Sequence, residues 1–537
     1  MEPIWYKNFG DIPQEIDADT YPNVWAMMSP AIEKYRDRAA FHNFGASLTY
    51  GDLGGKSRDL AAYLQTELGL KKGDRIAVMS PNMMAFPIAL CANIRSGLVQ
   101  VNVNPLYTPR ELEHQLNDAD TETIIIYSGS TPVLAEIIAN TSIKNVIVAN
   151  LGDFGNGQVP SPPCDERITN AVSFTDAVTA GADMDFAAPD VSGDDLIFLQ
   201  YTGGTTGLSK GAMLTHRNLV SNIMAFTAFG GDKIVEGEEV VITALPLYHI
   251  FALMVNCLTF FVIGGENVLV TNPRDMPGFV KELGNWKFTV ITGVNTLYNG
   301  LLHTPGFGDL DFSSLRFSMG GGTAILEAVS NHWRKVTGMH ITEGYGLSET
   351  SPVVTVNPLG VDIFRSSIGF PFSSTDISLR DEDGKEVALG EPGELCVKGP
   401  QVMVGYWRKP EETAAVTTDD GYFCTGDIAT CDEDGYFRIV DRKKDMVLVS
   451  GFNVYPNEIE AVATLLDGVV ECACIGVPDE TTGEAVKLFV VGDATIEDIE
   501  AHCRANLTGY KVPKQIVYID EIPKSPVGKI LRRELRD

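Results

Sequence analysis

Glycine, threonine and lysine are concentrated in one short segment, Tyr201-Thr-Gly-Gly-Thr-Thr-Gly-Leu-Ser-Lys210-Gly211. Its candidate binding residues are Thr202, Gly203, Gly204, Thr205, Thr206, Gly207 and Lys210. The glycines free backbone N–H groups to point at an anion, the hydroxyls add donors, and the lysine adds positive charge. The pattern differs from Walker A, because Gly211 rather than Ser or Thr follows the lysine. We predict a phosphate-binding loop, with a flexible Gly/Thr turn as the alternative.

The elements around this loop follow an alternating pattern. From Arg75 onward, short β-branched runs alternate with helical segments, which predicts βαβ units and largely parallel sheets. One helix carries its own start signal, with Thr108 as N-cap, Pro109 in the first turn and Glu111 closing a capping box. Thr215 is placed to cap the helix after the loop. The Gly, Pro and Asp-rich stretch 152–193 is predicted to be a surface loop.

The pattern changes near residue 375. Short strands separated by Gly turns predict a small antiparallel subdomain, and the last 90 or so residues predict an α+β unit. The expected fold is therefore α/β, with a large N-terminal domain of βαβ-built sheets plus the antiparallel subdomain, and a small mobile C-terminal α+β domain. We place the domains at 1–443 and 444–537. The charged run 441–445 at the junction is predicted to be exposed and to act as a hinge.

Composition narrows the function classes. The chain has 537 residues and a formal net charge of −30, which repels nucleic acids and anionic bilayers. Nine cysteines without paired spacing favour free thiols in a reducing compartment, and Cys472 and Cys474 are predicted to lie in a strand core. The start has no secretory signal pattern, and the apolar stretch from Phe251 to Ile263 is too short for a membrane span. We expect a cytoplasmic protein without a nucleic-acid partner.

Further motifs occur in a fixed order after the loop: LPLYHIF (245–251), GYGLSET (344–350), YFCTGDIA (422–429), YFRIVDRKKDMVLVSGFNVYPNEIE (436–460) and PKSPVGKILRREL (523–535). With them, the chain resembles the adenylate-forming superfamily of acyl-CoA synthetases, luciferases and peptide-synthetase adenylation domains. It is most similar to bacterial long-chain fatty-acid–CoA ligases, almost end to end. The resemblance implies that a fatty carboxylate attacks the α-phosphorus of ATP, giving acyl-AMP and pyrophosphate, and that CoA then takes the acyl group.

The resemblance also assigns the nucleotide residues. ATP is expected to contact the loop residues 202–207, Lys210, Gly321, Gly322, Tyr345, Gly346, Ser348, Asp427, Arg442 and Lys529. Tyr345 is expected to stack on adenine, Ser348 to donate to the α-phosphate, and Asp427 to bind the ribose hydroxyls. Glu349, with Thr202, is expected to hold Mg²⁺. Without the resemblance, Glu349 is better interpreted as a solvated loop residue. The three glycines at 320–322 either let the adenine edge approach the backbone, which we favour, or form a plain turn.

Lys529 corresponds to the lysine that bridges the carboxylate and the α-phosphate during adenylation, whereas by itself it is one cation of a solvated basic face. Family members then rotate the small domain about the position of Lys444, so that Ser450 and Gly451 contact the pantetheine of CoA. His249 is either a residue of the acyl pocket or a core histidine. The stretch from Phe251 to Phe261 either lines a channel or fills the core. Cys424 stands where fatty-acyl ligases often have histidine.

Three alternatives have other consequences. The first keeps the fold but acts as a fatty acyl-AMP ligase for a carrier protein, or as a CoA ligase for medium-chain or aromatic acids. The second is a catalytically silent lipid- or nucleotide-binding protein, which would be expected to lack Glu349, Lys210 or Lys529. The third, a P-loop ATPase, conflicts with Gly211. The resemblance also allows a homodimer and peripheral contact with the inner face of the membrane, although no basic amphipathic segment indicates it.

Overall fold

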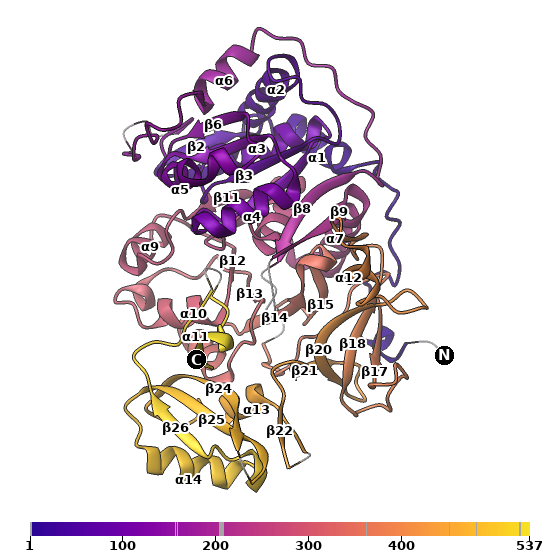
Figure 1. The fold of residues 1–537 in the computed structure, drawn as a ribbon, viewed down its shortest axis with the longest axis vertical. Coiled ribbons are helices and arrows are strands. Elements are labelled where there is room, and N and C mark those ends of the chain that lie inside the picture. The colour runs from indigo at the N-terminus through magenta and orange to yellow at the C-terminus, as the bar shows by residue number, and fades with distance from the viewer. Residues whose placement is uncertain are drawn as a thin grey trace.

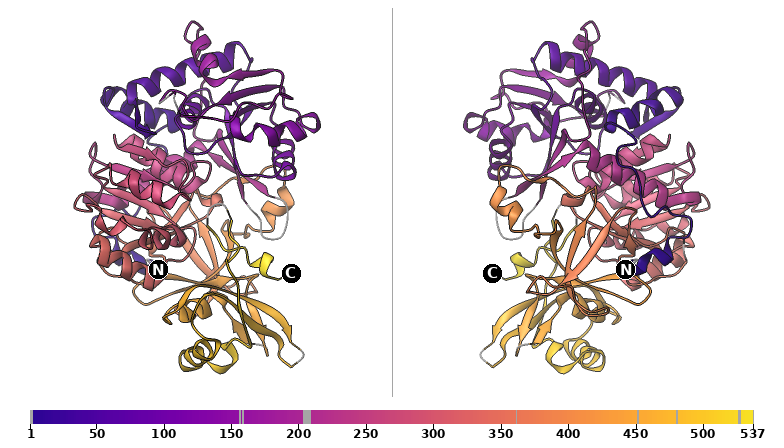
Figure 2. Two further views of the ribbon diagram at one scale, coloured as in Figure 1. Left: turned by 90° about the vertical axis from the view of Figure 1, so that its left-hand side faces the viewer. Right: turned by 90° about the vertical axis from the view of Figure 1, so that its right-hand side faces the viewer.

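The computed structural model describes residues 3–155, 157, 159–202, 209–360, 362–450, 452–479, 481–525 and 528–536. Two large sheets, each backed by helices, form the upper and middle parts of the molecule, and a small antiparallel sheet lies beside them (Figure 1). The C-terminal sheet lies at the opposite end, below both (Figure 2). This arrangement confirms the predicted α/β class with a large N-terminal part and a smaller C-terminal part.

The first large sheet has nine strands, and those from β14 to β1 run parallel. In spatial order they are β16 (Phe370–Pro371), β15 (Val353–Val356), β14 (Ile341–Gly346), β13 (Phe317–Gly320), β12 (Val290–Gly293), β10 (Val240–Thr243), β11 (Glu266–Leu269), β1 (Ala39–Asn43) and β2 (Ala46–Thr49). The carboxyl ends of β12, β13 and β14 therefore meet at one edge, where parallel α/β sheets usually place their ligand sites.

The second large sheet has eight strands, of which six are parallel. In spatial order they are β19 (Gly405–Tyr406), β9 (Lys210–Thr215), β8 (Leu196–Thr202), β4 (Val99–Val103), β3 (Arg75–Met79), β5 (Thr123–Tyr127), β6 (Asn145–Ala149) and β7 (Ala171–Ser173). Strands β8 and β9 pair antiparallel, with Thr202 opposite Lys210, so the Gly/Thr loop connects them as a hairpin. The βαβ prediction is thus confirmed for the body of the sheet and wrong at this edge, because β9 pairs antiparallel with β8.

The α-helices are α1 (Val24–Lys34), α2 (Tyr50–Thr66), α3 (Ala85–Arg95), α4 (Pro109–Ala119), α5 (Thr131–Ile137), α6 (Phe174–Gly181), α7 (His216–Gly230), α8 (Phe260–Val262), α9 (Met276–Leu283), α10 (Asn295–Leu302), α11 (Glu327–Thr337), α12 (Pro410–Ala414), α13 (Pro456–Ala463) and α14 (Ile496–Asn506). The predicted N-caps are confirmed, since Thr108 and Thr215 both form capping boxes. The predicted surface loop 152–193 is wrong in part, because it contains β7 and α6. Ser173 caps α6, whose Phe174 and Val178 are buried.

The other two sheets carry the C-terminal motifs. The antiparallel sheet contains β17 (Asp376–Arg380), β18 (Gly393–Lys398), β20 (Phe423–Cys431) and β21 (Phe437–Arg442), which confirms the predicted antiparallel subdomain. The C-terminal sheet contains β23 (Phe452–Val454), β22 (Val447–Val449), β25 (Gly483–Gly492), β24 (Val469–Asp479) and β26 (Gln515–Tyr518). Cys472 and Cys474 are buried in β24, as predicted. The short hairpin β22–β23 was not predicted.

Candidate active site

The strand ends that flank the Gly/Thr loop are fixed by a neighbouring aromatic residue and a helix. The Lys210 ammonium pairs with Glu412 of α12 and lies 4.9 Å from the centre of the Tyr406 ring. Tyr406 belongs to β19, which pairs with β9. The Lys210 side chain is therefore held at the mouth of the loop. Gly203, Gly204, Thr205, Thr206 and Gly207 lie outside the described residues, so their predicted roles stay predictions.

Glu349 lies in a short 3₁₀ helix (Ser348–Thr350) directly after β14. Only 8% of the residue is exposed, and burial raises the pKa of its carboxyl group. The Tyr406 hydroxyl donates to Oε1 at 2.9 Å, and the backbone carbonyl accepts from the Met403 N–H at 2.7 Å. The interpretation of Glu349 as a solvated loop residue is wrong. A buried carboxylate with oxygen lone pairs to spare is suited to hold a hard cation such as Mg²⁺.

Tyr345, Asp427 and Arg442 come together from three strands. The Tyr345 hydroxyl donates to Asp427 Oδ2 at 2.6 Å, and Arg442 Nε lies 3.4 Å from Asp427 Oδ1. Asp427 and Arg442 are register partners on β20 and β21, so the pairing of these strands fixes their separation. Burial raises the pKa of Tyr345 well above its ordinary value, with the negative Asp427 adding to the effect. The phenol is therefore a permanent donor that orients the carboxylate.

The glycines at the end of β13 bring the backbone close to this site. A Cβ at Gly321 would lie 3.1 Å from the Gly344 carbonyl and 3.3 Å from the Phe251 ring. Gly322 has a φ of +77°, which favours glycine. The helix that follows begins only at Glu327, so the glycines do not lie in the first turn of that helix. Gly321 therefore packs against Gly344, the residue before Tyr345, and we call residues 320–322 the glycine ledge.

Lys529 reaches this ledge from the C-terminal part. A Cβ at Gly322 would lie 3.8 Å from Lys529 Cε, and one at Gly528 would lie 2.9 Å from a Val294 methyl. The chain after β26 rises from the lower sheet toward the middle of the molecule (Figure 1, Figure 2). Burial lowers the pKa of Lys529 to about 8; Arg442 lowers it further, whereas Asp427 and Glu349 raise it. Residues far apart in sequence thus share one electrostatic environment.

His249 belongs to the same environment. Burial lowers its pKa to about 3, and the positive charge of Lys529 adds to the shift, so the imidazole is neutral. The Phe251 N–H donates to Nδ1 at 3.3 Å, which leaves the proton on Nε2. His249 is therefore a neutral imidazole whose Nε2–H can act as a donor. The stretch after it forms a fully buried π-helix (Ala252–Thr259).

Two buried amides that the sequence analysis missed hold the turn that carries His249. Asn82 donates to the Leu245 carbonyl at 3.0 Å and accepts from the Leu247 N–H at 2.8 Å. Gln200 donates to the Tyr248 carbonyl at 3.0 Å. Gln200 is itself the end of a chain of amides in which each donates to the next, namely Asn93, Gln100, Asn102 and Gln200. The sequence offered one indication of these buried amides, namely polar residues within otherwise apolar strand segments.

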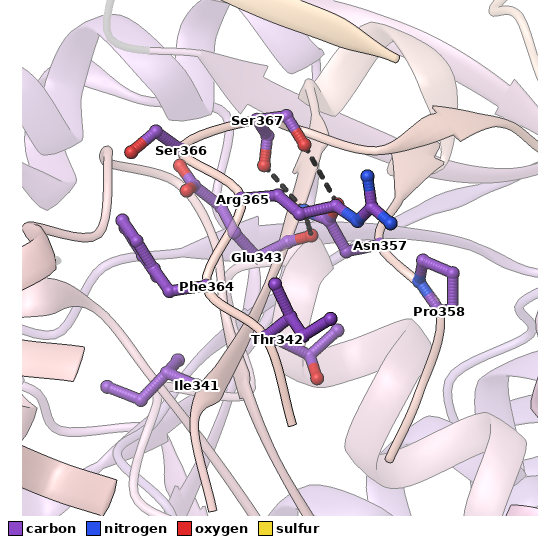
Figure 3. A pocket seen from close by; sticks show the side chains of 10 residues that line it. Ile341, Thr342, Glu343, Asn357, Pro358, Phe364, Arg365, Ser366 and Ser367 are labelled. Carbon is purple, nitrogen blue, oxygen red and sulfur yellow. Dashed lines mark hydrogen bonds between the residues drawn. The ribbon is translucent and has the colours of Figure 1, made fainter. Parts of the chain in front are cut away.

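A third residue that the sequence analysis missed, Glu343, lies behind the glycine ledge and bonds to the chain that follows it. Burial raises its pKa to about 8, and its Oε1 accepts from the Ile325 N–H at 3.3 Å. Glu343 lines a small pocket together with Asn357, Arg365 and Ser367 (Figure 3). Arg365 and Ser367 belong to the loop after β15. The Asn357 side chain donates to the Glu343 carbonyl at 3.1 Å and also to the Ser367 carbonyl. These two hydrogen bonds connect the loop to β14. The only signal was a charged residue next to Gly-Tyr-Gly.

The junction between the two parts is less exposed than predicted. Lys443 and Lys444 are exposed, but Asp441 and Asp445 are buried. Asp441 Oδ2 accepts from the Asn457 N–H at 2.9 Å, and burial raises its pKa to about 6. The prediction of an exposed charged run is therefore wrong for the two aspartates, because each faces groups of the C-terminal part.

Arg532 connects that junction to the Lys529 segment. Its guanidinium contacts Glu460 at 2.9 Å, Asn457 Oδ1 at 2.7 Å and Asp445 at 3.7 Å. The side chain is only 12% exposed. The interpretation of the tail as a solvated basic face is wrong at this residue.

Ser450 does not lie with the other candidate residues. It is exposed at the end of β22, with a φ of +51°, and its N–H donates to the Thr482 carbonyl at 2.8 Å. Strand β22 lies with the C-terminal sheet, below the two large sheets (Figure 1). The arrangement thus presents Lys529, and not Ser450, to the strand ends. Gly451 lies outside the described residues.

Two negative observations concern the described ranges. Within them, no group of three or more His, Cys, Asp or Glu side chains gathers into a metal-binding cluster. No helix in the part of the chain that the structure describes is long and apolar enough to cross a bilayer. A single carboxylate such as Glu349 fits the usual Mg²⁺ site, in which one or two protein carboxylates are combined with substrate phosphates and water.

Comparison with known proteins agrees with this geometry. Residues 29–407 match the model of the AMP-binding enzyme family, and residues 458–529 match that of the AMP-binding enzyme C-terminal domain. The chain belongs to the AMP-binding enzyme family. It is 52% identical to a long-chain-fatty-acid–CoA ligase of Yersinia pestis and 51% identical to one of Salmonella typhimurium, in each case over 100% of this chain and 98% of the relative. The ATP-bound structure of MatB from Rhodopseudomonas palustris superposes with a TM-score of 0.83, at 32% identity, over 96% of this chain and 98% of that one.

Proposed function

We propose that this protein is an AMP-forming long-chain fatty-acid–CoA ligase. It activates a fatty carboxylate with ATP to acyl-AMP and pyrophosphate, and then transfers the acyl group to CoA with release of AMP. The observation that carries the proposal is the meeting of Lys529 with Asp427, Glu349 and Arg442 at the strand ends of a chain that is 52% identical to a ligase of that name. Both the charges and the whole-chain identity point to the same reaction.

In the first step, a carboxylate oxygen of the acid attacks the α-phosphorus, and the bond to pyrophosphate breaks. Negative charge is distributed over the phosphoryl oxygens during this displacement, so positioned cations stabilise it. Lys529 supplies an ammonium group between the two reactants, and the neutral His249 supplies a donor for the carboxylate. Asp427, oriented by Tyr345, accepts from the ribose hydroxyls. Ser348 and Gly346 face the α-phosphate, and residues 202–207 with Lys210 hold the outer phosphates.

Glu349 and Thr202 are the residues that we assign to Mg²⁺. The Glu349 carboxylate fits this role because it is buried and has one protein donor, Tyr406, on Oε1. The ion would neutralise charge on the phosphate oxygens when bound.

In the second step, the thiol of CoA attacks the acyl carbonyl and AMP leaves. Lys529 has no role in this step, so we propose that residues 444–537 turn as a unit relative to residues 1–443, with Lys444 as the pivot. The turn would withdraw Lys529 and bring Ser450 and Gly451 of the β22–β23 hairpin to the site. The exposed β22–β23 hairpin supports this motion. A homodimer, a cytoplasmic location and peripheral membrane contact stay predictions from the family resemblance.

The deciding experiment incubates the purified protein with magnesium-ATP and acids from acetate to oleate plus an aromatic acid, with and without CoA. Pyrophosphate and thioester are both measured. We expect both products, with the highest kcat/KM among long chains. Pyrophosphate without thioester would contradict CoA as acceptor and favour a carrier protein. A maximum with the aromatic acid would contradict the chain class, and no pyrophosphate with any acid would contradict the enzyme.

A further inference from the structure

Two cysteines face each other across the antiparallel sheet beside the candidate nucleotide site. Cys396 of β18 and Cys424 of β20 are register partners, and their sulfur atoms are 3.2 Å apart. No disulfide joins them. A disulfide bond is about 2.05 Å long, so the sulfurs need to approach by roughly 1.2 Å. The sequence spacing of 28 residues gave no sign of this pair, because it is made by strand pairing.

The backbone at this position suits a disulfide. The Cys424 N–H donates to the Val416 carbonyl at 2.7 Å, on the side away from β18. Cys396 and Cys424 therefore form a non-hydrogen-bonded pair, at which antiparallel strands bring Cα atoms to about 4.5 Å and side chains closest together. That separation lies within the range that disulfides span. The bond can thus form by side-chain rotation with little movement of the strands.

The two thiols differ in access and charge. Cys396 is fully buried, whereas Cys424 is partly exposed. The hydrogen bond from Cys396 lowers the pKa of the Cys424 thiol, and the positive charges of Arg380 and Lys443 act in the same direction. Burial and the Cys424 partner raise the pKa of Cys396. A partly exposed, more acidic thiol beside a buried one is the arrangement of an attacking and a resolving cysteine.

The pair lies at the base of the bulge that carries Asp427. Glu394 pairs with Ile428 and Cys396 with Cys424, so a single residue of β18 opposes residues 425–427 of β20. The Thr425 hydroxyl donates to the Leu395 carbonyl at 2.8 Å and accepts from the Asp427 N–H at 3.1 Å. A displacement of Cys424 is therefore transmitted to Asp427 through one intervening turn.

The same bulge touches the junction between the two parts. The Lys443 N–H donates to the Gly426 carbonyl at 2.9 Å, and the Lys443 ammonium contacts Glu394 at 2.9 Å. The residue before the proposed pivot is thus hydrogen-bonded to the bulge. Movement at the cysteine pair would reach both the ribose-binding carboxylate and the start of the pivot.

We propose that Cys396 and Cys424 are a site of reversible oxidation, and that their disulfide weakens ATP binding by shifting the bulge that holds Asp427. With a peroxide as oxidant, the Cys424 thiolate attacks one oxygen and releases hydroxide, which leaves a sulfenic acid. The Cys396 thiolate then attacks that sulfur and displaces a second hydroxide. Two thiols and hydrogen peroxide give one disulfide and two waters. A dithiol reverses the reaction by exchange. The effect on ATP rests on the function proposed above.

The test treats the reduced full-length protein with hydrogen peroxide and maps its peptides without reduction. We expect a cross-linked peptide that contains Cys396 and Cys424, about 2 Da lighter than its reduced parts because two hydrogens are lost. The KM for ATP in pyrophosphate release should rise several-fold and return after dithiothreitol. Cys396→Ser and Cys424→Ser should keep the basal activity and lose the response. Cys164→Ser, which changes the other partly exposed cysteine, should respond like the wild type.

The outcomes separate this proposal from the proposed function. If no cross-link forms while Cys164 is oxidised, the site is overturned. If the cross-link forms and the KM for ATP does not change, the link to Asp427 is overturned. If no acid gives pyrophosphate, the proposed function fails, but the peptide map still decides the cross-link. Calorimetric titration with ATP then replaces the kinetic readout, and an equal affinity of the oxidised and reduced protein would overturn the effect on binding.

Discussion

The strand-end site and the C-terminal segment that carries Lys529 are built in different ways. Tyr345, Asp427 and Glu349 extend from or directly follow paired strands, and each is bonded to a side chain from another element. Lys529 instead lies on a short hairpin whose backbone closes on Ser525 and whose Gly528 packs against Val294. Tyr345 and Asp427, which hold the nucleotide in both chemical steps under the proposed function, are thus fixed by sheet pairing. Lys529, which is needed only for adenylation under the proposed function, lies on a segment that can move away from the strand-end site.

The C-terminal segment depends on a buried ion network, which offers the largest perturbation. Arg532→Met removes the cationic partner of Glu460 and leaves that carboxylate buried without it, whereas Asp445 keeps Arg536 at 3.3 Å. Breaking a buried pair in this way costs about 3 to 5 kcal/mol. We expect a lower melting temperature of the C-terminal part in calorimetry and a loss of adenylation. Arg533→Met, whose side chain is 61% exposed, is the matched control and should melt like the wild type.

Lys529→Ala tests whether this segment serves one step alone. Loss of one positioned donor or charge at a transition state costs about 10² to 10³ in rate. We expect that loss in acid-dependent pyrophosphate formation, and a near-normal rate of thioester formation from synthetic acyl-AMP and CoA. Lys524→Ala removes a lysine of the same segment that pairs with Glu471 at 2.8 Å, and should change neither rate. Equal losses in both steps would contradict the division of labour between the two regions.

Lys444→Pro tests the pivot. Proline fixes its own φ and restricts the residue before it, so the unit that follows can no longer turn freely. A misplacement of about 1 Å at a reacting centre can cost about 10²-fold. We expect a loss of that order in thioester formation, with adenylation largely intact, because the arrangement seen here already presents Lys529. Lys444→Ala removes the same side chain without introducing the proline ring, and should retain both steps. If Lys444→Ala loses thioester formation as Lys444→Pro does, the loss comes from the missing side chain and not from the restricted backbone.

The pH dependence follows from the Lys529 environment. Its pKa is lowered to about 8, so the ammonium form is complete below that value and is lost as the pH rises through it. The kcat/KM of adenylation, which reports the free enzyme, should fall about tenfold per unit above pH 8. In the pH profile of kcat, this fall should begin at a higher pH, because the negative charge of bound ATP raises the pKa of Lys529. Lys529→Arg, which stays protonated, should lack this fall, and a fall that persists in it would assign the titration to another group.

Much of the fold was predictable, because it depends on local signals. Capping boxes at Thr108 and Thr215 and the alternation of strands and helices are written in neighbouring residues. The antiparallel turn from β8 to β9 and the helix α6 inside a Gly-rich stretch were not predicted. Both depend on elements that are distant in sequence. In α6, for example, Phe174 is buried because this helix packs against another helix that covers the same sheet.

The candidate site was predictable only as a set of residues. Motif resemblance named Tyr345, Asp427 and Lys529, but not the partners that orient them. Tyr406, Gln200 and Arg532 act through contacts that join residues 57, 48 and 72 positions apart, and no local pattern encodes such pairs. Charge alone misled at Arg532 and Glu349, because a charged residue is expected at the surface unless a buried partner is known.

The smallest expected effect concerns one of these partners. Tyr406→Phe keeps the ring beneath the Lys210 ammonium but removes the hydroxyl that donates to Glu349 at 2.9 Å. Loss of such a hydrogen bond costs about 1 kcal/mol, or about fivefold. The carboxylate then gains protons more readily, so the Mg²⁺ concentration for half-maximal adenylation should rise by that factor while the acid KM stays unchanged. Tyr35→Phe removes a comparable bond to Glu236, at 2.7 Å on the outer surface, and should leave the Mg²⁺ dependence as it was. An unchanged Mg²⁺ requirement in Tyr406→Phe would show that Glu349 is positioned by its backbone alone.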